Sequence, residues 1–173
     1  MENNVSRSIR IEKLTLNIGA GKNTALLEKG LKLLKTITGT QPVKTVTQKR
    51  IPAWGLRPGL PIGCKVTLRK QAAQEVLQKL LQAKNHVLKE TQFDDNGNVA
   101  FGIHEYIDIP SVKYDPEIGI IGFEVCVTLE RPGFRIKRRK VHKKKITTRH
   151  RITKQDAIEF MKNSFKVKVG EEE

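Results

Sequence analysis

Apolar and polar residues alternate near the start of the chain in a way that predicts a half-buried strand. From Glu12 to Gly21 the apolar positions recur at every second residue, and the polar side carries Thr15 and Asn17. Ile9 and Ile11 are out of phase with this run. The strand is therefore expected either to start after them or to contain a β-bulge that shifts its register.

Leucine-rich stretches with helical spacing predict two amphipathic helices. The first covers residues 26–37 and stops at Gly39, and the second runs from Ala73 to Leu88. Thr153 and Asp156 form a capping-box pair, which predicts the start of a short final helix. The first two helices each have one apolar side, so each is expected to cover a face of a sheet.

The remaining strands are predicted by short runs of β-prone residues. Val43 to Gln48 is rich in valine and threonine, and Gly63 to Arg69 places apolar residues on one side and two cations and a hydroxyl on the other. Phe93 to Ile103 contains a turn at residues 95–97, which suggests a hairpin. Ile121 to Leu129 has the clearest alternation of the chain.

Strands and helices that are each apolar on one side predict an α+β fold. We expect a mostly antiparallel sheet with helices packed on one face and a polar face left open. A single domain should cover residues 1–173, with a basic extended segment at 134–151 and a flexible tail at 170–173. The open face is the expected place for function.

The net charge indicates what this open face binds. The 173 residues include 33 Lys and Arg against 18 Asp and Glu, a formal net charge of +15. Such an excess attracts polyanions, so nucleic acid is the first candidate partner and an anionic membrane the second. The longest apolar run, Ile118 to Phe123, is too short to span a bilayer. Cys64 and Cys126 are far apart and lack a Cys-x-x-Cys motif, so we expect a cytoplasmic protein without a disulfide framework or zinc site.

The densest positive charge lies between residues 135 and 151, which hold ten cations and no acid. Because such a run repels itself when no anion is present, we predict that it binds nucleic-acid phosphates and is mobile when unbound. The alternative is a solvated surface loop or a localisation signal. The ten residues are Arg135, Lys137, Arg138, Arg139, Lys140, Lys143, Lys144, Lys145, Arg149 and Arg151.

A long loop between two predicted strands carries the only tryptophan of the chain. The loop covers Gln48 to Ile62 and is stiffened by three prolines, and loops longer than about 12–15 residues are often functional. Trp54 could stack on an exposed base of RNA. The alternative is that Ile51, Trp54 and Leu56 fold back over the core. The cations of this loop are Lys49, Arg50 and Arg57.

Two further motifs suggest chemistry. Residues 17–22 pass through two glycines into a helix whose free amides could hold a phosphate, although a simple tight turn explains them equally well. His104, Glu105 and Asp108 could bind a metal in an RNA nuclease, which is the alternative function that the sequence leaves open. Since no second cluster supports a metal, we predict no enzyme activity and no cofactor.

Four blocks of sequence resemble a known family, and together they extend over nearly the whole chain. They are LNIGAG at residues 16–21, TGTQPV at 38–43, RPGLPIG at 57–63 leading into VTLR at 66–69, and LERPG at 129–133. In these blocks the chain is similar to the large-subunit ribosomal protein that binds 5S rRNA, universal family five, in its archaeal and eukaryotic form.

The resemblance implies a structural protein that attaches 5S rRNA to the large ribosomal subunit in the central protuberance. The implied partners also include large-subunit rRNA, P-site tRNA, other central-protuberance proteins and a small-subunit head protein reached as an inter-subunit bridge. By position, the implied 5S rRNA contacts are Asn17, Gln41, Lys44, Thr45, Thr67 and Arg69. The implied tRNA-facing loop covers residues 48–60, with Lys49, Arg50, Trp54 and Arg57 as its candidate contacts.

Overall fold

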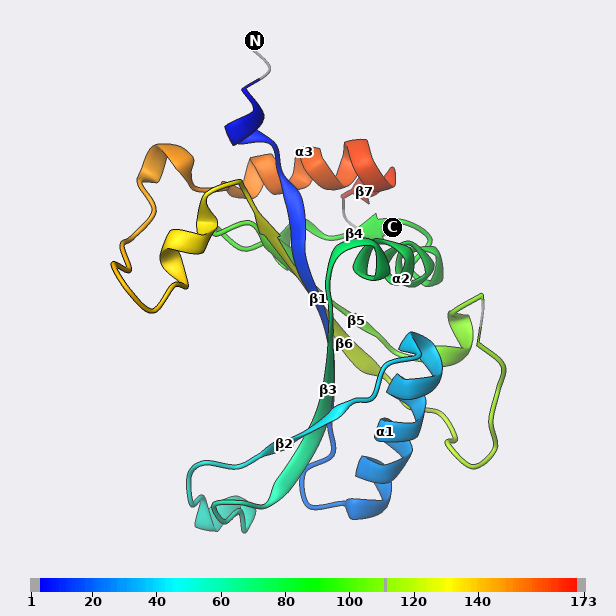
Figure 1. Cartoon of the computed structure of the whole chain (residues 1–173). Helices are drawn as coiled ribbons and strands as arrows, with labels where there is room; N and C mark the ends of the chain where they lie inside the picture. Colours follow the sequence, from blue (N-terminus) through cyan, green and yellow to red (C-terminus); the bar gives the residue numbers. More distant parts are fainter. Residues whose placement is uncertain (1–3, 111, 171–173) are drawn as a thin grey trace.

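The computed structural model describes residues 4–110 and 112–170, and its largest element is a five-stranded antiparallel sheet (Figure 1). The strands follow the spatial order β2-β3-β1-β6-β5, so the first strand of the chain is the central one. Their bounds are β1 (Arg10–Gly19), β2 (Val43–Val46), β3 (Pro61–Leu68), β5 (Asn98–Ile103) and β6 (Phe123–Glu130).

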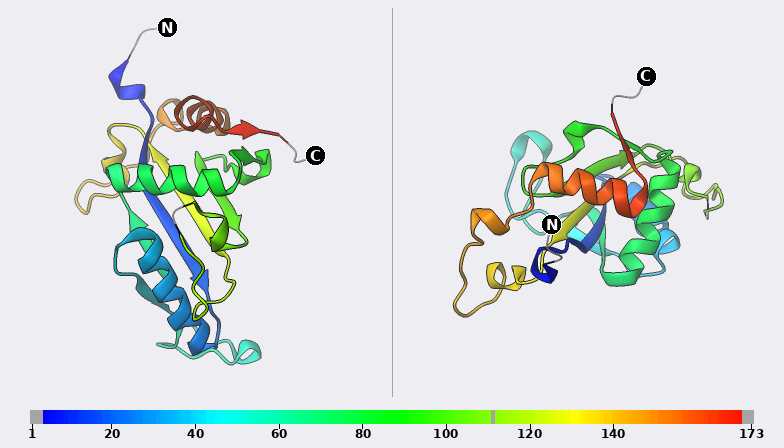
Figure 2. Two further views of the ribbon diagram at one scale, coloured as in Figure 1. Left: turned by 90° about the vertical axis from the view of Figure 1, so that its right-hand side faces the viewer. Right: turned by 90° about the horizontal axis from the view of Figure 1, so that it is seen from above.

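Two helices cover one face of this sheet, α1 (Thr24–Thr38) and α2 (Lys70–Ala83), as Figure 2 shows from two further directions. A third helix, α3 (Lys154–Phe165), packs beside β5. The strands contribute buried apolar residues to the core in rows, since Leu16 is in register with both Val66 and Val125. This arrangement confirms the predicted α+β fold.

The ends of the helices follow the predicted local chemistry in two cases. Gly39 ends α1 in the left-handed conformation, with φ of 66°. The side chain of Thr153 accepts a hydrogen bond from the amide of Asp156, and the Asp156 carboxylate accepts one from the Thr153 amide. Both predicted boundaries are thus confirmed.

The predicted extension of the second helix to Leu88 is wrong. The helix stops at Ala83, because Asn85 and His86 adopt positive φ angles of 51° and 58° and turn the chain away. Val87 and Leu88 then form β4, which pairs in parallel with β7 (Lys168–Val169). Apolar spacing alone could not separate a helical turn from this short strand, whose partner lies about eighty residues later.

The expected irregularities of the strands are present in modified form. The pairing of β1 with β6 shifts between Ile11 and Lys13, which confirms the β-bulge. The predicted hairpin around residues 95–97 forms, but its first side is reduced to a single bridge between Phe93 and Val99. The turn is closed by the Asp94 amide, which donates to the carbonyl of Asn98 at 2.9 Å.

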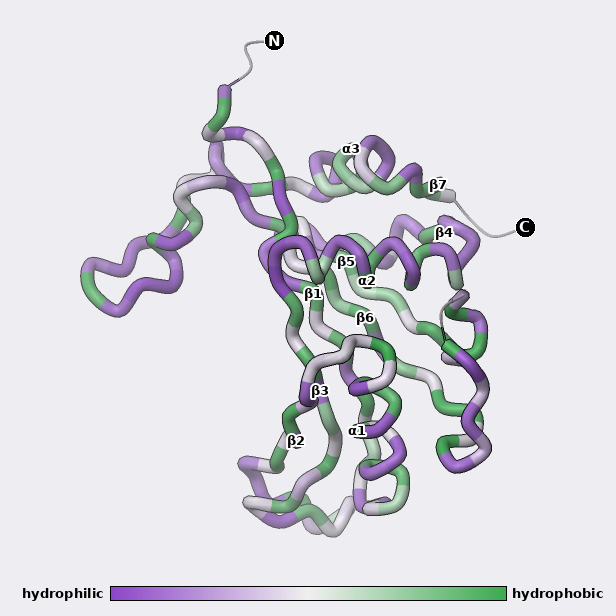
Figure 3. The backbone as a smooth tube through the Cα atoms, turned by 45° about the vertical axis from the view of Figure 1, so that its right-hand side comes forward, coloured by the Kyte–Doolittle hydropathy of each residue, from purple (hydrophilic) through white to green (hydrophobic). Residues whose placement is uncertain are grey.

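Two segments project from the sheet on the side opposite α1 and α2 (Figures 1 and 2). One is the loop between β2 and β3. The other is the segment of residues 134–151, called the basic arm below, which is mostly hydrophilic in Figure 3. The arm contains short 3-10 turns at Phe134–Lys137 and Thr148–His150. Of the predicted flexible tail at 170–173, residues 171–173 lie outside the described residues.

Candidate nucleic-acid interface

The open face of the sheet is lined by side chains from four strands that stand opposite one another in register. Because successive residues of a strand point to opposite faces, the residues that alternate with the buried core positions share this face. One row across it runs Thr67, Thr15, Cys126 and Ala100, and the next runs Lys65, Asn17, Glu124 and Gly102. Hydroxyl, amide and amino groups therefore project from a rigid backbone.

Glycines leave parts of the backbone on this face uncovered by side chains. A Cβ atom built on Gly19 or on Gly102 would meet no other atom within 4 Å, so the backbone there is open to an approaching ligand. Gly63, opposite Gly19, is different because its Cβ would lie 2.5 Å from the backbone oxygen of Ile18. Glycine is required at this position by the close approach of the β1 and β3 backbones.

The two cysteines mark the two sides of the sheet. Cys64 is fully buried on the side covered by the helices, and burial raises the pKa of its thiol to about 11. Cys126 is partly exposed in the row of Thr15 on the open face. Burial and the neighbouring Glu124 carboxylate raise the pKa of the Cys126 thiol as well.

The sequence-predicted contacts Asn17, Thr45, Thr67 and Arg69 share the open side of the sheet. Asn17 and Thr67 stand in adjacent rows, and Thr45 is paired with Gly63 on the neighbouring strand. Arg69 follows β3 in extended conformation, which keeps it on the side of Thr67.

Two other predicted contacts sit at the edge of the sheet. Lys44 is exposed on edge strand β2, but it pairs with Cys64, so the alternation assigns it to the side of the helices. Gln41 is exposed just before this strand.

The register also brings residues to this face that the list of predicted contacts left out. Lys65 stands next to Asn17, and Lys13 pairs with Thr128. Their alternation was visible in the sequence, but only the pairing of the strands shows that they join Asn17 and Thr67 on one surface. Glu124 places an acid on the same face, so the face is polar and mixed in charge.

The loop between β2 and β3 folds into a compact turn. The amides of Ile51 and Leu56 each donate to the other residue's carbonyl at 3.0 Å, and Pro52–Trp54 forms a 3-10 turn between them. Leu56 is buried, whereas Trp54 is 66% exposed. Leu56 is buried within the loop but is not part of the main core cluster, so the structure does not support folding of this loop back over the core, and Trp54 is exposed to a partner. Lys49, Arg50 and Arg57 are exposed on the same loop.

The glycine turn after β1 is bonded to the start of β3, and it therefore offers few free amides for phosphate. The amides of Ala20 and Gly21 both donate to the carbonyl of Ile62, at 2.8 and 2.9 Å. The side chain of Asn23 caps α1 by accepting from the amide of Leu26. The turn is thus explained by the structural alternative, because it ties the start of α1 to β3.

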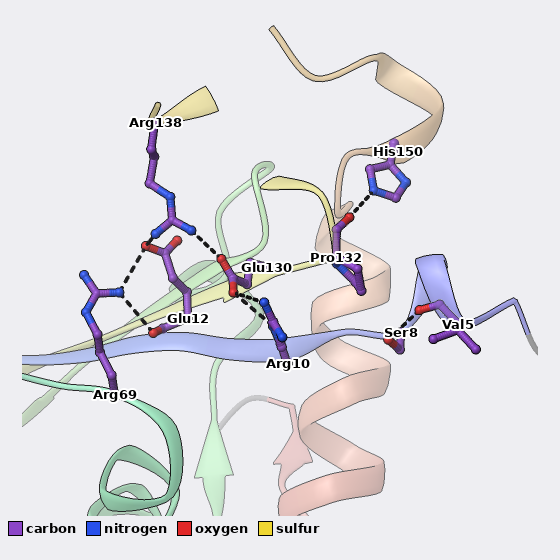
Figure 4. Close-up of polar contacts among 9 residues, drawn as sticks. All are labelled: Val5, Ser8, Arg10, Glu12, Arg69, Glu130, Pro132, Arg138 and His150. Atoms are coloured by element: carbon purple, nitrogen blue, oxygen red, sulfur yellow. Dashed lines mark hydrogen bonds and ion pairs between the residues drawn. The ribbon is translucent and has the colours of Figure 1, made fainter. Parts of the chain in front are cut away.

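All ten cations of the basic arm are exposed, as the phosphate-binding hypothesis requires. The arm is nevertheless attached at its base by an ion-pair network, drawn in Figure 4. Arg138 pairs with both Glu12 and Glu130, and its Nη2 lies 2.7 Å from the Glu130 carboxylate. Arg10 pairs with the same carboxylate at 2.8 Å, and Arg69 lies 3.6 Å from Glu12. Two of the predicted RNA contacts, Arg69 and Arg138, are therefore held in place by carboxylates of the sheet.

The other end of the arm is fixed by a buried arginine. Arg131 donates to the carbonyl of Arg151 at 3.1 Å and to the Asp156 carboxylate at 3.0 Å. His150 lies with a ring nitrogen 2.9 Å from the carbonyl of Pro132. Both ends of the arm are thus anchored to the body, and the cations between them face solvent.

The described residues do not assemble a metal-binding group of three or more His, Cys, Asp or Glu side chains. His104, Glu105 and Asp108 are exposed around a short 3-10 turn that follows β5. In the described ranges there is also no helix with the length and apolar character needed to cross a bilayer.

Comparison with known proteins places this chain in a family. Residues 4–57 match the family model described as ribosomal protein L5, and residues 61–160 match the model for the C-terminus of the same ribosomal protein family. The chain belongs to the ribosomal protein L5 family, also called uL5. Large ribosomal subunit protein uL5 of Sulfolobus acidocaldarius is 49% identical over 97% of this chain and 94% of its own length. The uL5 proteins of Nanoarchaeum equitans and Methanosphaera stadtmanae are 49% and 43% identical, over 94% and 96% of this chain and 96% and 99% of their own lengths.

Membership of the uL5 family identifies a structural protein of the large ribosomal subunit, a cytoplasmic particle, and not an enzyme. The resemblance inferred from the four sequence blocks is therefore confirmed at the level of the family. Two observations speak against the nuclease alternative. The described residues contain no metal-binding group, and the relatives named above are ribosomal proteins and not enzymes.

Proposed function

We propose that this uL5 protein binds 5S rRNA through the open face of its sheet and helps attach it to the large subunit in the central protuberance. The observation that carries the proposal is the shared face of Asn17, Thr67 and Arg69, which the register and extended backbone bring to one side of the sheet. Such a face can recognise the shape of a folded RNA, because its donors are held in fixed positions by the strands.

The basic arm supplies the second part of the proposed mechanism. Its exposed cations neutralise phosphates of the large-subunit rRNA and add affinity that weakens with salt, but little choice between RNAs. The face selects the RNA and the arm strengthens the complex. Residues 134–151 thus act as an extension of a single RNA-binding domain.

The loop between β2 and β3 is proposed to contact P-site tRNA. The exposure of Trp54, together with the cations Lys49, Arg50 and Arg57 around it, suits stacking on a base or sugar near phosphates. By family resemblance we extend the proposal to a bridge with a small-subunit head protein and to contacts with other central-protuberance proteins.

A gel shift with 5S rRNA in the presence of excess tRNA competitor tests the main proposal. Lys65→Ala on the open face should weaken 5S rRNA binding, whereas Lys79→Ala on the exposed side of α2 removes the same charge and should not. Arg69→Ala should lower the affinity by about 1–3 kcal/mol. Specific recognition by this face would be contradicted if tRNA displaced the bound 5S rRNA as well as free 5S rRNA does. Equal effects of the two lysine variants would contradict it too.

A further inference from the structure

A small hollow at the base of the basic arm has the chemistry of a nucleotide site. It has a volume of about 210 Å³, and its walls come from the arm, from the residues that lead into α3 and from the turn before β5. Phe134, Ile146 and Ile152 supply apolar atoms, and Asn96 supplies an amide. Ligand pockets for drug-sized molecules occupy about 300–1,000 Å³, so this hollow suits one planar base and not a larger cofactor.

The charged part of the lining is purely cationic. Lys137, Lys145 and Arg151 line the hollow, and no Asp or Glu of the described residues does. A second, wider hollow of about 660 Å³ is lined by Lys143, Lys144 and three further cations of the arm. Lys137 and Lys145 belong to both. The first hollow is partly apolar, and it shares two lysines with the second, which is lined by cations alone. Two adjoining hollows of this kind suit a base and the phosphates joined to it.

The hollow is built by specific contacts of the arm with the body. A Cβ atom on Gly97 would lie 2.5 Å from Cγ2 of Ile152, so the turn that carries Asn96 rests directly on the base of the arm. The amide of Lys144 donates to the carbonyl of Ile136 at 3.2 Å, which closes the arm on itself. Phe134 contacts His150 edge to face, with ring centroids 5.7 Å apart.

From this arrangement we infer that the hollow receives one unpaired, unstacked nucleotide of a bound RNA. Its base lies against Phe134, Ile146 and Ile152, where the side-chain amide of Asn96 can both donate to and accept from the base edge. The flanking phosphates lie in the second hollow. The inference rests on the proposed RNA-binding function, and it adds base recognition to a segment that would otherwise bind phosphates alone.

The test compares two RNA trinucleotides, one with adenine at the centre and one abasic at that position, on the full chain with isotope-labelled isoleucine methyl groups. The adenine probe should bind at least about threefold more tightly and shift the methyl signals of Ile146 and Ile152, which the abasic probe should leave in place. Phe134→Leu keeps an apolar side chain but loses the aromatic ring. Asn96→Ala removes an exposed turn side chain, whose amide also donates to the Asp94 carboxylate at 3.4 Å. Both should bring the ratio of the two affinities close to one.

Lys143→Ala is the matched control, because Lys143 lines only the second hollow. It should weaken both probes equally and keep their ratio. Equal binding of the two probes by the unaltered protein, or an unchanged ratio in Phe134→Leu, would overturn the inference. Adenosine monophosphate that binds as tightly as the trinucleotide would also overturn it, since the site would then serve free nucleotides.

The failure of this inference can be distinguished from failure of the proposed function. A protein that selects 5S rRNA over tRNA in the gel shift but ignores the missing base refutes the nucleotide site alone. A protein that discriminates the abasic probe but treats 5S rRNA and tRNA alike refutes the proposed function and leaves the site intact.

Discussion

Replacing Glu130 by glutamine tests whether the ion-pair network holds the basic arm to the sheet. The Glu130 side chain is only 10% exposed, and its carboxylate accepts hydrogen bonds from Arg10 and Arg138. Glutamine preserves the shape and one acceptor oxygen but removes the negative charge. We expect a less stable protein, because the two arginines lose their shared counter-charge.

The size of the effect follows from the burial of the partners. Breaking a fully buried ion pair costs about 3–5 kcal/mol, whereas an exposed pair contributes about 0–1 kcal/mol. Glu130 is nearly buried, but Arg10 and Arg138 are 65% and 44% exposed, so water can solvate both cations after the substitution. An intermediate loss of about 1–2 kcal/mol in the free energy of unfolding is expected.

Urea denaturation followed by circular dichroism measures this loss. For a chain of this size about 1–2 kcal/mol corresponds to a fall of roughly 2–8 °C in Tm. Glu124→Gln is the matched control, since Glu124 is exposed on the same strand and its substitution should change stability by less than about 0.5 kcal/mol. A double-mutant cycle with Arg138→Gln, which removes the arm's own partner of Glu130, should give a coupling energy of at least about 0.5 kcal/mol.

A change below about 0.3 kcal/mol in Glu130→Gln, or a coupling energy near zero, would refute this reasoning, because it falls within the error of additivity. The arm would then be attached mainly by the contacts of Arg131 and not by the network in Figure 4.

Three other outcomes follow from the structure. Gly63→Ala should destabilise the fold by about 1–3 kcal/mol because its Cβ would overlap the Ile18 carbonyl, whereas Gly102→Ala has open space and should cost about 1 kcal/mol or less; thermal denaturation compares them. Cys126 should react slowly with iodoacetamide, because its pKa is raised too, but faster than the fully buried Cys64, and bound 5S rRNA should protect it. Mass spectrometry of the labelled chain would contradict the proposed face if RNA gave no protection. Trp54→Ala should leave unfolding unchanged within about 0.5 kcal/mol but weaken tRNA binding, measured by fluorescence anisotropy.

Much of the fold was predictable because its elements are recorded in local patterns. The alternation in β1 and β6 gives a period of two whatever the neighbours are, and Gly39 and Thr153 act on the turn next to them. The same locality explains the wrong extension of α2, since the strand at Val87 depends on pairing with a distant segment.

The candidate site was only partly predictable. The sequence marked Asn17, Thr67 and the cations of the arm by residue type and family resemblance. It could not place Lys65 beside Asn17, nor show that Glu12 holds Arg138, a residue 126 positions later. The nucleotide-sized hollow likewise combines Asn96 with residues of the arm.

The sequence by itself determined the family, the net charge and most of the strands and helices of this protein. The tertiary structure decided which polar residues share a face, where the arm is anchored and where a base could enter. The physical reason is that periodicity and capping act over one or two turns of chain, whereas register, ion pairs and cavities form only when burial of the apolar faces brings distant segments together.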